Sequence, residues 1–183
     1  DGAKPYDCDP VTGIARRFVP GQAHGMPTLT GLAHDRLSHV AYNPEINEEG
    51  IRHRSLKLAA LQKTLKAPPV FGAAEGDLLV VGWGSTKGAI EEAVERLRAE
   101  GRKVSSLHLR FIQPLPGGIK EVLNRFKQVM TVEASWCDSP DDQVIDETNR
   151  RYSALAMMLR ARYLVDVDCW SEVRGQPIRP DTI

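Results

Sequence analysis

The stretch Asp77-Leu-Leu-Val-Val-Gly-Trp-Gly-Ser-Thr-Lys-Gly-Ala-Ile90 carries the clearest structural signal in the chain. Its first half, Leu78–Gly82, is an uncharged apolar run between charged flanks, which is typical of a short parallel strand covered on both faces. Gly82 and Gly84 allow a sharp turn, and Ser85 is a good N-cap for the helix that follows. The stretch therefore predicts a strand, a glycine turn and a helix whose amino terminus could face a phosphate or a partner chain.

Strand and helix patterns alternate after this stretch. Repeated strand–helix units imply right-handed crossovers and a mostly parallel sheet between two layers of helices. We therefore expect a three-layer α/β/α domain over residues 70–183. The expected elements are a helix at 85–100, a strand at 104–109, a helix at 116–126, a strand at 129–133, a helix at 148–162 and a strand at 164–167.

The amino-terminal part has a different pattern. Residues 1–45 contain five prolines and five glycines and show no lasting helical or strand period. We therefore expect an irregular arm that wraps another surface or returns from an upstream domain. A helix is expected from Glu45 to Leu65, and Ala67-Pro68-Pro69 would stop it. The predicted division is an arm, helix and linker over residues 1–69 and the α/β domain over residues 70–183.

Composition sets limits on function. The 183 residues carry no formal net charge, which argues against nucleic acid or an acidic membrane as a partner. No window approaches the roughly 20 apolar residues of a membrane span. Three distant cysteines and the lack of a Cys-x-x-Cys pair predict free thiols in the cytoplasm and no metal site in this chain. Because the sequence opens on Asp1 rather than Met, we expect a piece of a longer polypeptide or a processed product.

The glycine turn admits two interpretations. Its G-x-G-x-x-x-G pattern, with Gly82, Gly84, Ser85, Thr86 and Gly88, is one residue longer than the dinucleotide fingerprint, so an autonomous dinucleotide-binding domain is one hypothesis. The second strand ends in an arginine, where that fingerprint expects an acidic residue. We favour the second interpretation, a tight turn required by packing or by a partner.

The arm holds two groups of candidate site residues. His34, Asp35 and His39 lie within six residues in a loop, where they could form an interface, approach an active site on another domain, bind a metal or be plain polar residues. Arg16 and Arg17 could hold an anion or belong to an exposed arm anchored by one phenylalanine. We expect His24 and His53 to be exposed, and His108 to lie on the opposite face of its strand from its leucine neighbours.

Two carboxylates lie at the end of the third predicted strand of the α/β domain. Glu133 and Asp138 belong to the carboxyl edge of the sheet, where α/β proteins gather their sites, but no nucleophile or second acid at a known distance supports acid–base chemistry there. Cys137 lies in the same acidic run. A reactive thiol needs a cationic neighbour, so we expect Cys137 to be inert.

Several segments together resemble the α subunit of 2-oxoacid:ferredoxin oxidoreductases, especially those acting on 2-oxoglutarate. The arm has Thr30-Gly31-Leu32, His34-Asp35 and His39-Val40-Ala41-Tyr42 where that family has T-G-x-x-H-x-x-x-x-H-V-x-Y. The order of the later segments also agrees, and the resemblance covers nearly the whole chain. One departure is an acidic insertion through Asp146, which replaces a short run into the last helix. The later matching segments are 76–86, 106–110, 114–116, 163–167 and 175–177.

The resemblance implies a transketolase C-terminal-like domain of an enzyme that oxidatively decarboxylates a 2-oxoacid to acyl-CoA. The complete enzyme would use thiamine diphosphate, Mg²⁺, an iron–sulfur cluster and coenzyme A, with none of these bound by this chain alone. Its partners would be an upstream pyrimidine-binding domain of the same polypeptide, a β subunit, and ferredoxin through the holoenzyme. His34, Asp35 and His39 would face the active site, and Arg16 and Arg17 would contact an anion such as coenzyme A.

Overall fold

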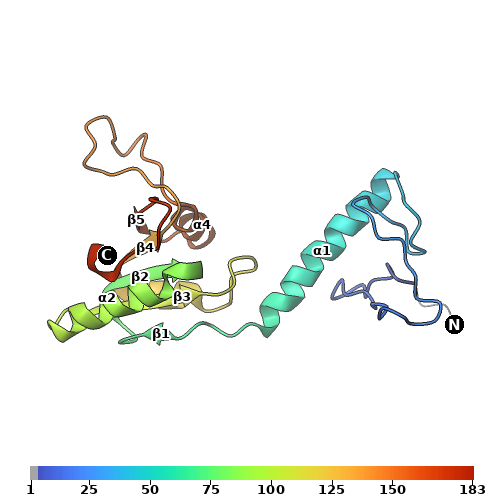
Figure 1. Cartoon of the computed structure of the whole chain (residues 1–183), viewed down its shortest axis with the longest axis horizontal. Helices are drawn as coiled ribbons and strands as arrows, with labels where there is room; N and C mark the ends of the chain where they lie inside the picture. The colour runs from blue at the N-terminus through green and yellow to red at the C-terminus, as the bar shows by residue number, and fades with distance from the viewer. Residues whose placement is uncertain (1–3) are drawn as a thin grey trace. The chain divides into compact units, whose positions relative to one another are not determined.

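The structure, a computed structural model, describes residues 4–183 and consists of two units. Unit 1 runs to Leu65 and unit 2 from Lys66 to Ile183. Unit 1 contains the arm and one helix, α1, whereas unit 2 contains the sheet and its covering helices (Figure 1).

Unit 1 is irregular outside its helix, as the sequence predicts. The arm contains two isolated β-bridges, Cys8 to Ala15 and His34 to Val40. Helix α1 (Pro44–Thr64) confirms the expected helix and begins with proline in its first turn, where the ring's fixed φ and missing N–H are tolerated. A Cβ on Gly13 would lie 2.3 Å from the carbonyl oxygen of His53, so the arm packs tightly on this helix. The expectation that His53 is exposed is therefore wrong, because only 15% of its side chain is accessible.

Unit 2 is built on one five-stranded sheet in the order β1-β3-β2-β4-β5. The pairs β2–β3, β2–β4 and β4–β5 are parallel, and β1 runs antiparallel to β3 at one edge (Figure 1). This confirms the mostly parallel sheet. The strands are β1 (Val70–Phe71), β2 (Gly76–Trp83), β3 (Val104–Leu109), β4 (Phe126–Glu133) and β5 (Asp168–Ser171).

Helices cover both faces of this sheet and produce the expected three layers. Successive strand residues point to opposite faces, so Val80 packs with Ile90 and Val94 of helix α2 (Lys87–Ala99). On the other face, Leu79 and Val81 pack with side chains of α3 (Ile119–Leu123) and α4 (Ala154–Tyr163). Two 3₁₀ turns, Gly84–Thr86 and Pro180–Thr182, complete the elements. None of the described helices is long and apolar enough to cross a membrane.

Several expected boundaries are wrong. The helix expected at 116–126 is only Ile119–Leu123, and Phe126 begins β4 three residues before the expected strand. Helix α4 begins at Ala154 rather than near residue 148, because Asp146 instead fixes a turn by accepting hydrogen bonds from the amide and hydroxyl of Thr148. The last strand is Asp168–Ser171 rather than 164–167, since Leu164 ends α4 with a positive φ of 54°. Helix α2 begins at Lys87 after a 3₁₀ turn, so Ser85 does not cap it.

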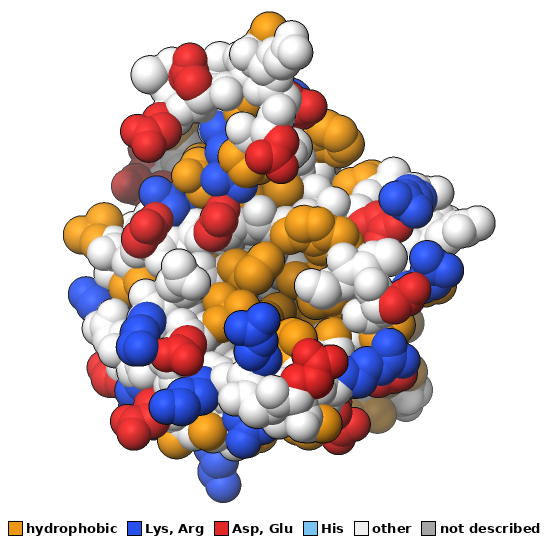
Figure 2. Space-filling view, turned by 90° about the vertical axis from the view of Figure 1, so that its left-hand side faces the viewer, with side chains coloured by type: hydrophobic (Ala, Val, Ile, Leu, Met, Phe, Trp, Pro, Cys, Tyr) orange, Lys and Arg blue, Asp and Glu red, His pale blue; other side chains and the backbone are white. Residues whose placement is uncertain are grey.

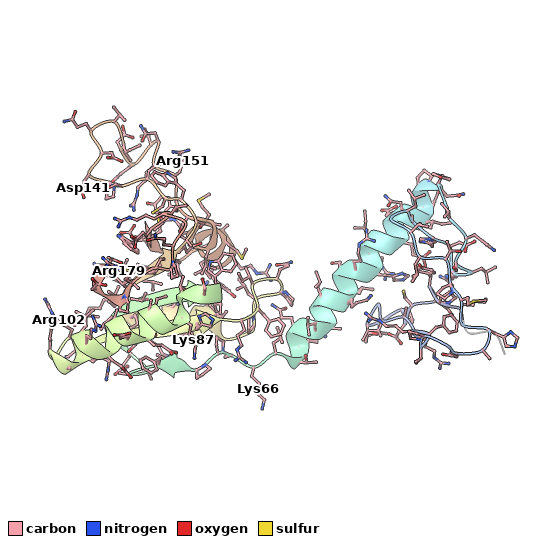
Figure 3. The ribbon with its side chains drawn as sticks, viewed as in Figure 1. Lys66, Lys87, Arg102, Asp141, Arg151 and Arg179 are labelled. Carbon is pink, nitrogen blue, oxygen red and sulfur yellow. The ribbon has the colours of Figure 1, made fainter. Side chains whose placement is uncertain are left out.

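The connection between β4 and α4 includes the acidic insertion. It stands out from the α/β unit, and Figure 2 shows acidic side chains grouped on this lobe. Asp141 lies on the projecting part, whereas Arg151 lies at its base (Figure 3).

Candidate functional site

The arm and α1 enclose a cavity of about 950 Å³ within unit 1. One wall is a single face of α1, since the helical residues that line it are spaced three or four apart. Of the predicted site residues, the structure brings Arg16, Arg17, His34 and Asp35 to this cavity. The lining residues from α1 are Ile46, Glu49, Gly50, His53, Arg54 and Lys57.

His34 is held in place on two sides. Its ring stacks on Tyr6, with the centroids 4.8 Å apart and the planes 4° from parallel. Its Nε2 atom lies 3.1 Å from the hydroxyl of Thr30. Stacking and this hydrogen bond together fix the imidazole at the cavity wall.

Asp35 organises the loop beyond His34. Its Oδ1 atom accepts hydrogen bonds from the amides of Leu37 and His39, each at 2.9 Å. Its Oδ2 atom lies 3.0 Å from Nδ1 of His39. The His39 amide, more than any other group, lowers the pKa of Asp35, so the carboxylate is ionised at neutral pH. An ionised Asp35 favours a hydrogen on Nδ1 of His39, which donates to it, so Nε2 is the ring nitrogen left for another partner.

The charged side chains around the cavity are unequally paired. Arg36 donates to Glu49 at 2.8 Å, and this hydrogen bond is the main reason why the pKa of Glu49 is lowered. Within residues 4–183, by contrast, four basic lining residues make no ion pair or side-chain hydrogen bond. The cavity wall therefore carries positive charge that the described part of the chain leaves unneutralised. The four residues are Arg16, Arg17, Arg54 and Lys57.

The glycine turn lies in unit 2 and is explained by packing. A Cβ on Gly82 would lie 2.3 Å from Cδ1 of Ile90 and 2.7 Å from Oγ1 of Thr86. Thr86 is buried and donates its hydroxyl hydrogen bond to the carbonyl of Trp83 at 2.9 Å. The space that a side chain at Gly82 would need is thus occupied by Ile90 and Thr86. This favours the packing interpretation over dinucleotide binding. Gly84 has a φ of 62°, and a Cβ on Gly84 or Gly88 would meet open space.

Glu133 is fully buried at the end of β4 and binds the first turn of α4. Its two carboxylate oxygens accept hydrogen bonds from the hydroxyls of Ser153 and Ser135, from the Trp83 indole at 3.3 Å and from the amides of Leu155 and Ala156. Burial raises the pKa of this carboxyl group, but the donors outweigh it and the net pKa is lowered. Every oxygen is occupied by the fold, so Glu133 is not free to act as an acid or base.

Asp138 is also committed to structure. It accepts from Nε and Nη2 of Arg151 at 2.9 and 2.8 Å and from the Trp136 indole at 2.8 Å. The Arg151 guanidinium is the main reason why the pKa of Asp138 is strongly lowered. The sequence predicts that Asp138 lies near the sheet edge, but no local pattern indicates that it pairs with Arg151, thirteen residues later.

His108 lies on the α2 side of β3, opposite Leu107 and Leu109, as expected from the alternation. Burial is the main reason why its pKa is lowered, and Lys87 adds to this effect. Its Nδ1 atom is buried without a hydrogen-bond partner in the described structure. Lys87 marks the beginning of α2 in Figure 3.

A second hollow, of about 690 Å³, lies at the amino-terminal ends of β2 and β4. Lys127 pairs with Asp77 at 2.7 Å, and Arg102 lies just beyond the end of α2 (Figure 3). Sequence reasoning missed this hollow because its residues come from three separate segments, 73–77, 98–103 and 125–127. The charged residues that line it are Glu75, Asp77, Arg98, Arg102, Lys103, Arg125 and Lys127.

A family model described as pyruvate:ferredoxin oxidoreductase core domain II matches residues 76–182, more than half of the chain. The chain belongs to this family. As a core domain II protein, it is 33% identical to the 2-oxoglutarate oxidoreductase subunit KorA of Mycobacterium tuberculosis over 98% of this chain and 25% of that relative. It is also 33% identical to the α subunit of 2-oxoacid:ferredoxin oxidoreductase 1 of Aeropyrum pernix, over 74% of this chain and 22% of the relative.

The structural comparison extends beyond the α/β unit of this core domain II protein. A 2-oxoglutarate:ferredoxin oxidoreductase from Magnetococcus marinus, with 2-oxoglutarate, coenzyme A and succinyl-CoA bound, matches 100% of this chain and 29% of that chain. The TM-score is 0.75 and the identity 25%. The chain thus spans about a quarter of the length of the curated relatives that it matches.

Proposed function

We propose that this chain is the core domain II portion, with its preceding arm, of the α subunit of a 2-oxoacid:ferredoxin oxidoreductase that acts on 2-oxoglutarate. The observation that carries this proposal is the match of the whole chain, arm included, to the Magnetococcus enzyme with 2-oxoglutarate and coenzyme A bound. The complete enzyme would convert a 2-oxoacid and coenzyme A to acyl-CoA and CO₂ while it passes two electrons to ferredoxin.

The arm cavity is the part of this chain that suits an anionic ligand. Arg16, Arg17, Arg54 and Lys57 present unneutralised positive charge, and apolar side chains such as Phe18 line the same space. Guanidinium groups bind phosphate with paired, charge-assisted hydrogen bonds. We assign the phosphates of coenzyme A to this cavity. When bound, coenzyme A supplies the thiol that accepts the acyl group.

His34, Asp35 and His39 are proposed to face the active site that the complete enzyme forms. Asp35 orients His39 through Nδ1, so that Nε2 can accept or return a proton. His34, fixed by Tyr6 and Thr30, adds a hydrogen-bonding group on the cavity wall.

The remaining cofactors are assigned to other parts of the enzyme. Among residues 4–183, no group of three His, Cys, Asp or Glu side chains gathers to hold a metal ion. We propose that thiamine diphosphate with Mg²⁺ and the iron–sulfur cluster belong to an upstream pyrimidine-binding domain of the same polypeptide and to a β subunit. Ferredoxin would meet the assembled enzyme, and the whole complex would work in the cytoplasm.

Kinetics of the assembled enzyme test the cavity directly. Arg16→Gln and Arg17→Gln should each raise the KM for coenzyme A about tenfold, because a charge-assisted hydrogen bond contributes about 1.5–3 kcal/mol. The KM for 2-oxoglutarate should stay unchanged. Arg52→Gln is the matched control, since this exposed residue lies on α1 outside the cavity lining.

The proposal would be contradicted if both cavity variants kept the wild-type KM for coenzyme A. A calorimetric titration of the 183-residue chain with coenzyme A, NAD and NADP separates the alternatives. Heat from a nicotinamide nucleotide would instead support a dinucleotide-binding domain.

A further inference from the structure

Two of the three cysteines lie side by side in unit 2. Cys137 follows β4 and Cys169 belongs to β5, and both are buried. The thiol of Cys137 donates to the carbonyl oxygen of Cys169 at 3.7 Å, while its amide donates to Oγ of Ser171 at 3.0 Å. These two contacts hold Cys137 against β5.

A cation stands beside this pair, and it comes from a segment that the sequence pattern did not connect to it. Nη2 of Arg150 lies 3.9 Å from Sγ of Cys169 and 3.3 Å from its carbonyl oxygen. Asp168 fixes the same guanidinium nitrogen at 2.8 Å. A cation therefore lies beside the Cys169 sulfur, although the sequence around Cys137 is acidic.

We propose that Cys137 and Cys169 form an oxidant-sensitive thiol pair, which hydroperoxides convert to an intrachain disulfide. The Cys169 sulfur attacks the peroxide oxygen and gives up its proton, the O–O bond breaks, and a sulfenic acid forms with release of water. The Cys137 sulfur then attacks the Cys169 sulfur, the S–O bond breaks, and the second oxygen leaves as water. Two thiols lose two electrons in total, and one peroxide accepts them with two protons to give two waters.

The roles of the two sulfurs follow from their surroundings. Cys169 reacts first because its sulfur is the one next to Arg150. Burial raises the pKa of Cys137. This suits a thiol that attacks the oxidised Cys169 sulfur rather than the oxidant itself. The bridge would join the end of β4 to β5 and close a loop that contains the acidic connection and α4.

Intact-mass measurement on the 183-residue chain tests the proposal in a Cys8→Ser background, which removes the third thiol in unit 1. Treatment with hydrogen peroxide should lower the mass by about 2 Da and leave no thiol that reacts with maleimide after unfolding. The oxidised chain should unfold at a temperature higher by roughly 5 °C, and dithiothreitol should reverse this shift.

Single variants distinguish the assigned order. With Cys137→Ala, dimedone should trap a sulfenic acid on Cys169, whereas with Cys169→Ala, dimedone should not label Cys137. Arg150→Met should slow oxidation several-fold, with thermal unfolding recorded to show that the fold persists. Two reactive thiols after peroxide treatment, or a disulfide only between two chains, would overturn the proposal.

Discussion

The arm cavity of unit 1 and the carboxyl edge of the sheet in unit 2 use charge in opposite ways. Around the cavity, Arg16, Arg17, Arg54 and Lys57 have no charged partner within the described residues. At the sheet edge, Glu133 accepts five hydrogen bonds and Asp138 is paired with Arg151. Saturated charges hold the fold together, whereas unneutralised ones are available to a ligand.

Replacing Glu133 should cause the largest loss of stability. Glu133→Gln puts an amide donor where several N–H and O–H donors converge, so buried donors lose their acceptor. We expect the free energy of unfolding to fall by at least about 3 kcal/mol. Urea unfolding followed by circular dichroism measures this loss. Glu147→Gln is the control on an exposed carboxylate, and equal losses in both variants would refute the anchoring role.

The position of Glu133 was predictable from the sequence, but its role was not. A carboxylate at the last position of a buried strand had to lie at the carboxyl edge of a parallel sheet. Its partners Trp83, Ser153 and Leu155 come from another strand and from the start of a helix that the sequence pattern placed several residues too early. Local periodicity does not show that α4 begins where its first amides donate hydrogen bonds to Glu133.

A pair of glycine substitutions separates packing from ligand binding in the turn. Gly82→Ala should cost about 1–3 kcal/mol, because the added Cβ overlaps Ile90 and Thr86. Gly88→Ala should leave stability unchanged or raise it by up to about 1 kcal/mol, since it lies within α2 and its Cβ meets open space. Thermal unfolding of both variants gives the comparison. A destabilised Gly88→Ala with a stable Gly82→Ala would reverse our interpretation of the turn.

The strands were predicted better than the ends of the helices. Uncharged runs identified β2 and β3 because central parallel strands are buried on both faces. The expected strand at 164–167 was wrong because apolar Leu164, Val165 and Val167 belong to the irregular connection between α4 and β5, where Leu164 is 87% exposed. A two-residue edge strand such as β1 is too short to leave a pattern in the sequence.

Acid should weaken unit 2 through the carboxylates of its sheet edge. Glu133 has a pKa below its ordinary value of 4.5 in the folded state, so its stabilising effect is complete above that pH. The effect is lost as the pH falls from about 4.5 through the lower folded pKa. Urea unfolding from pH 7 to pH 3 should show a decline that is reduced in Glu133→Gln. An identical slope in wild type and variant would show that Glu133 does not cause the decline.

The smallest effect on stability is expected at the cavity, and this makes it the sharpest test of the comparison. Arg54→Gln removes a cation that has no partner within the described residues and lies on the cavity wall with Lys57 and the two arm arginines. Its removal should change the free energy of unfolding by less than about 0.5 kcal/mol, and could raise it by relieving like-charge repulsion. Circular dichroism at 222 nm follows the loss of helix during thermal unfolding, and α1 is the longest of the described helices. A large loss of α1 stability would mean that Arg54 serves the fold, as the carboxylates of unit 2 do. An unchanged helix together with a weaker affinity for coenzyme A would mean that the positive charge is kept for a ligand.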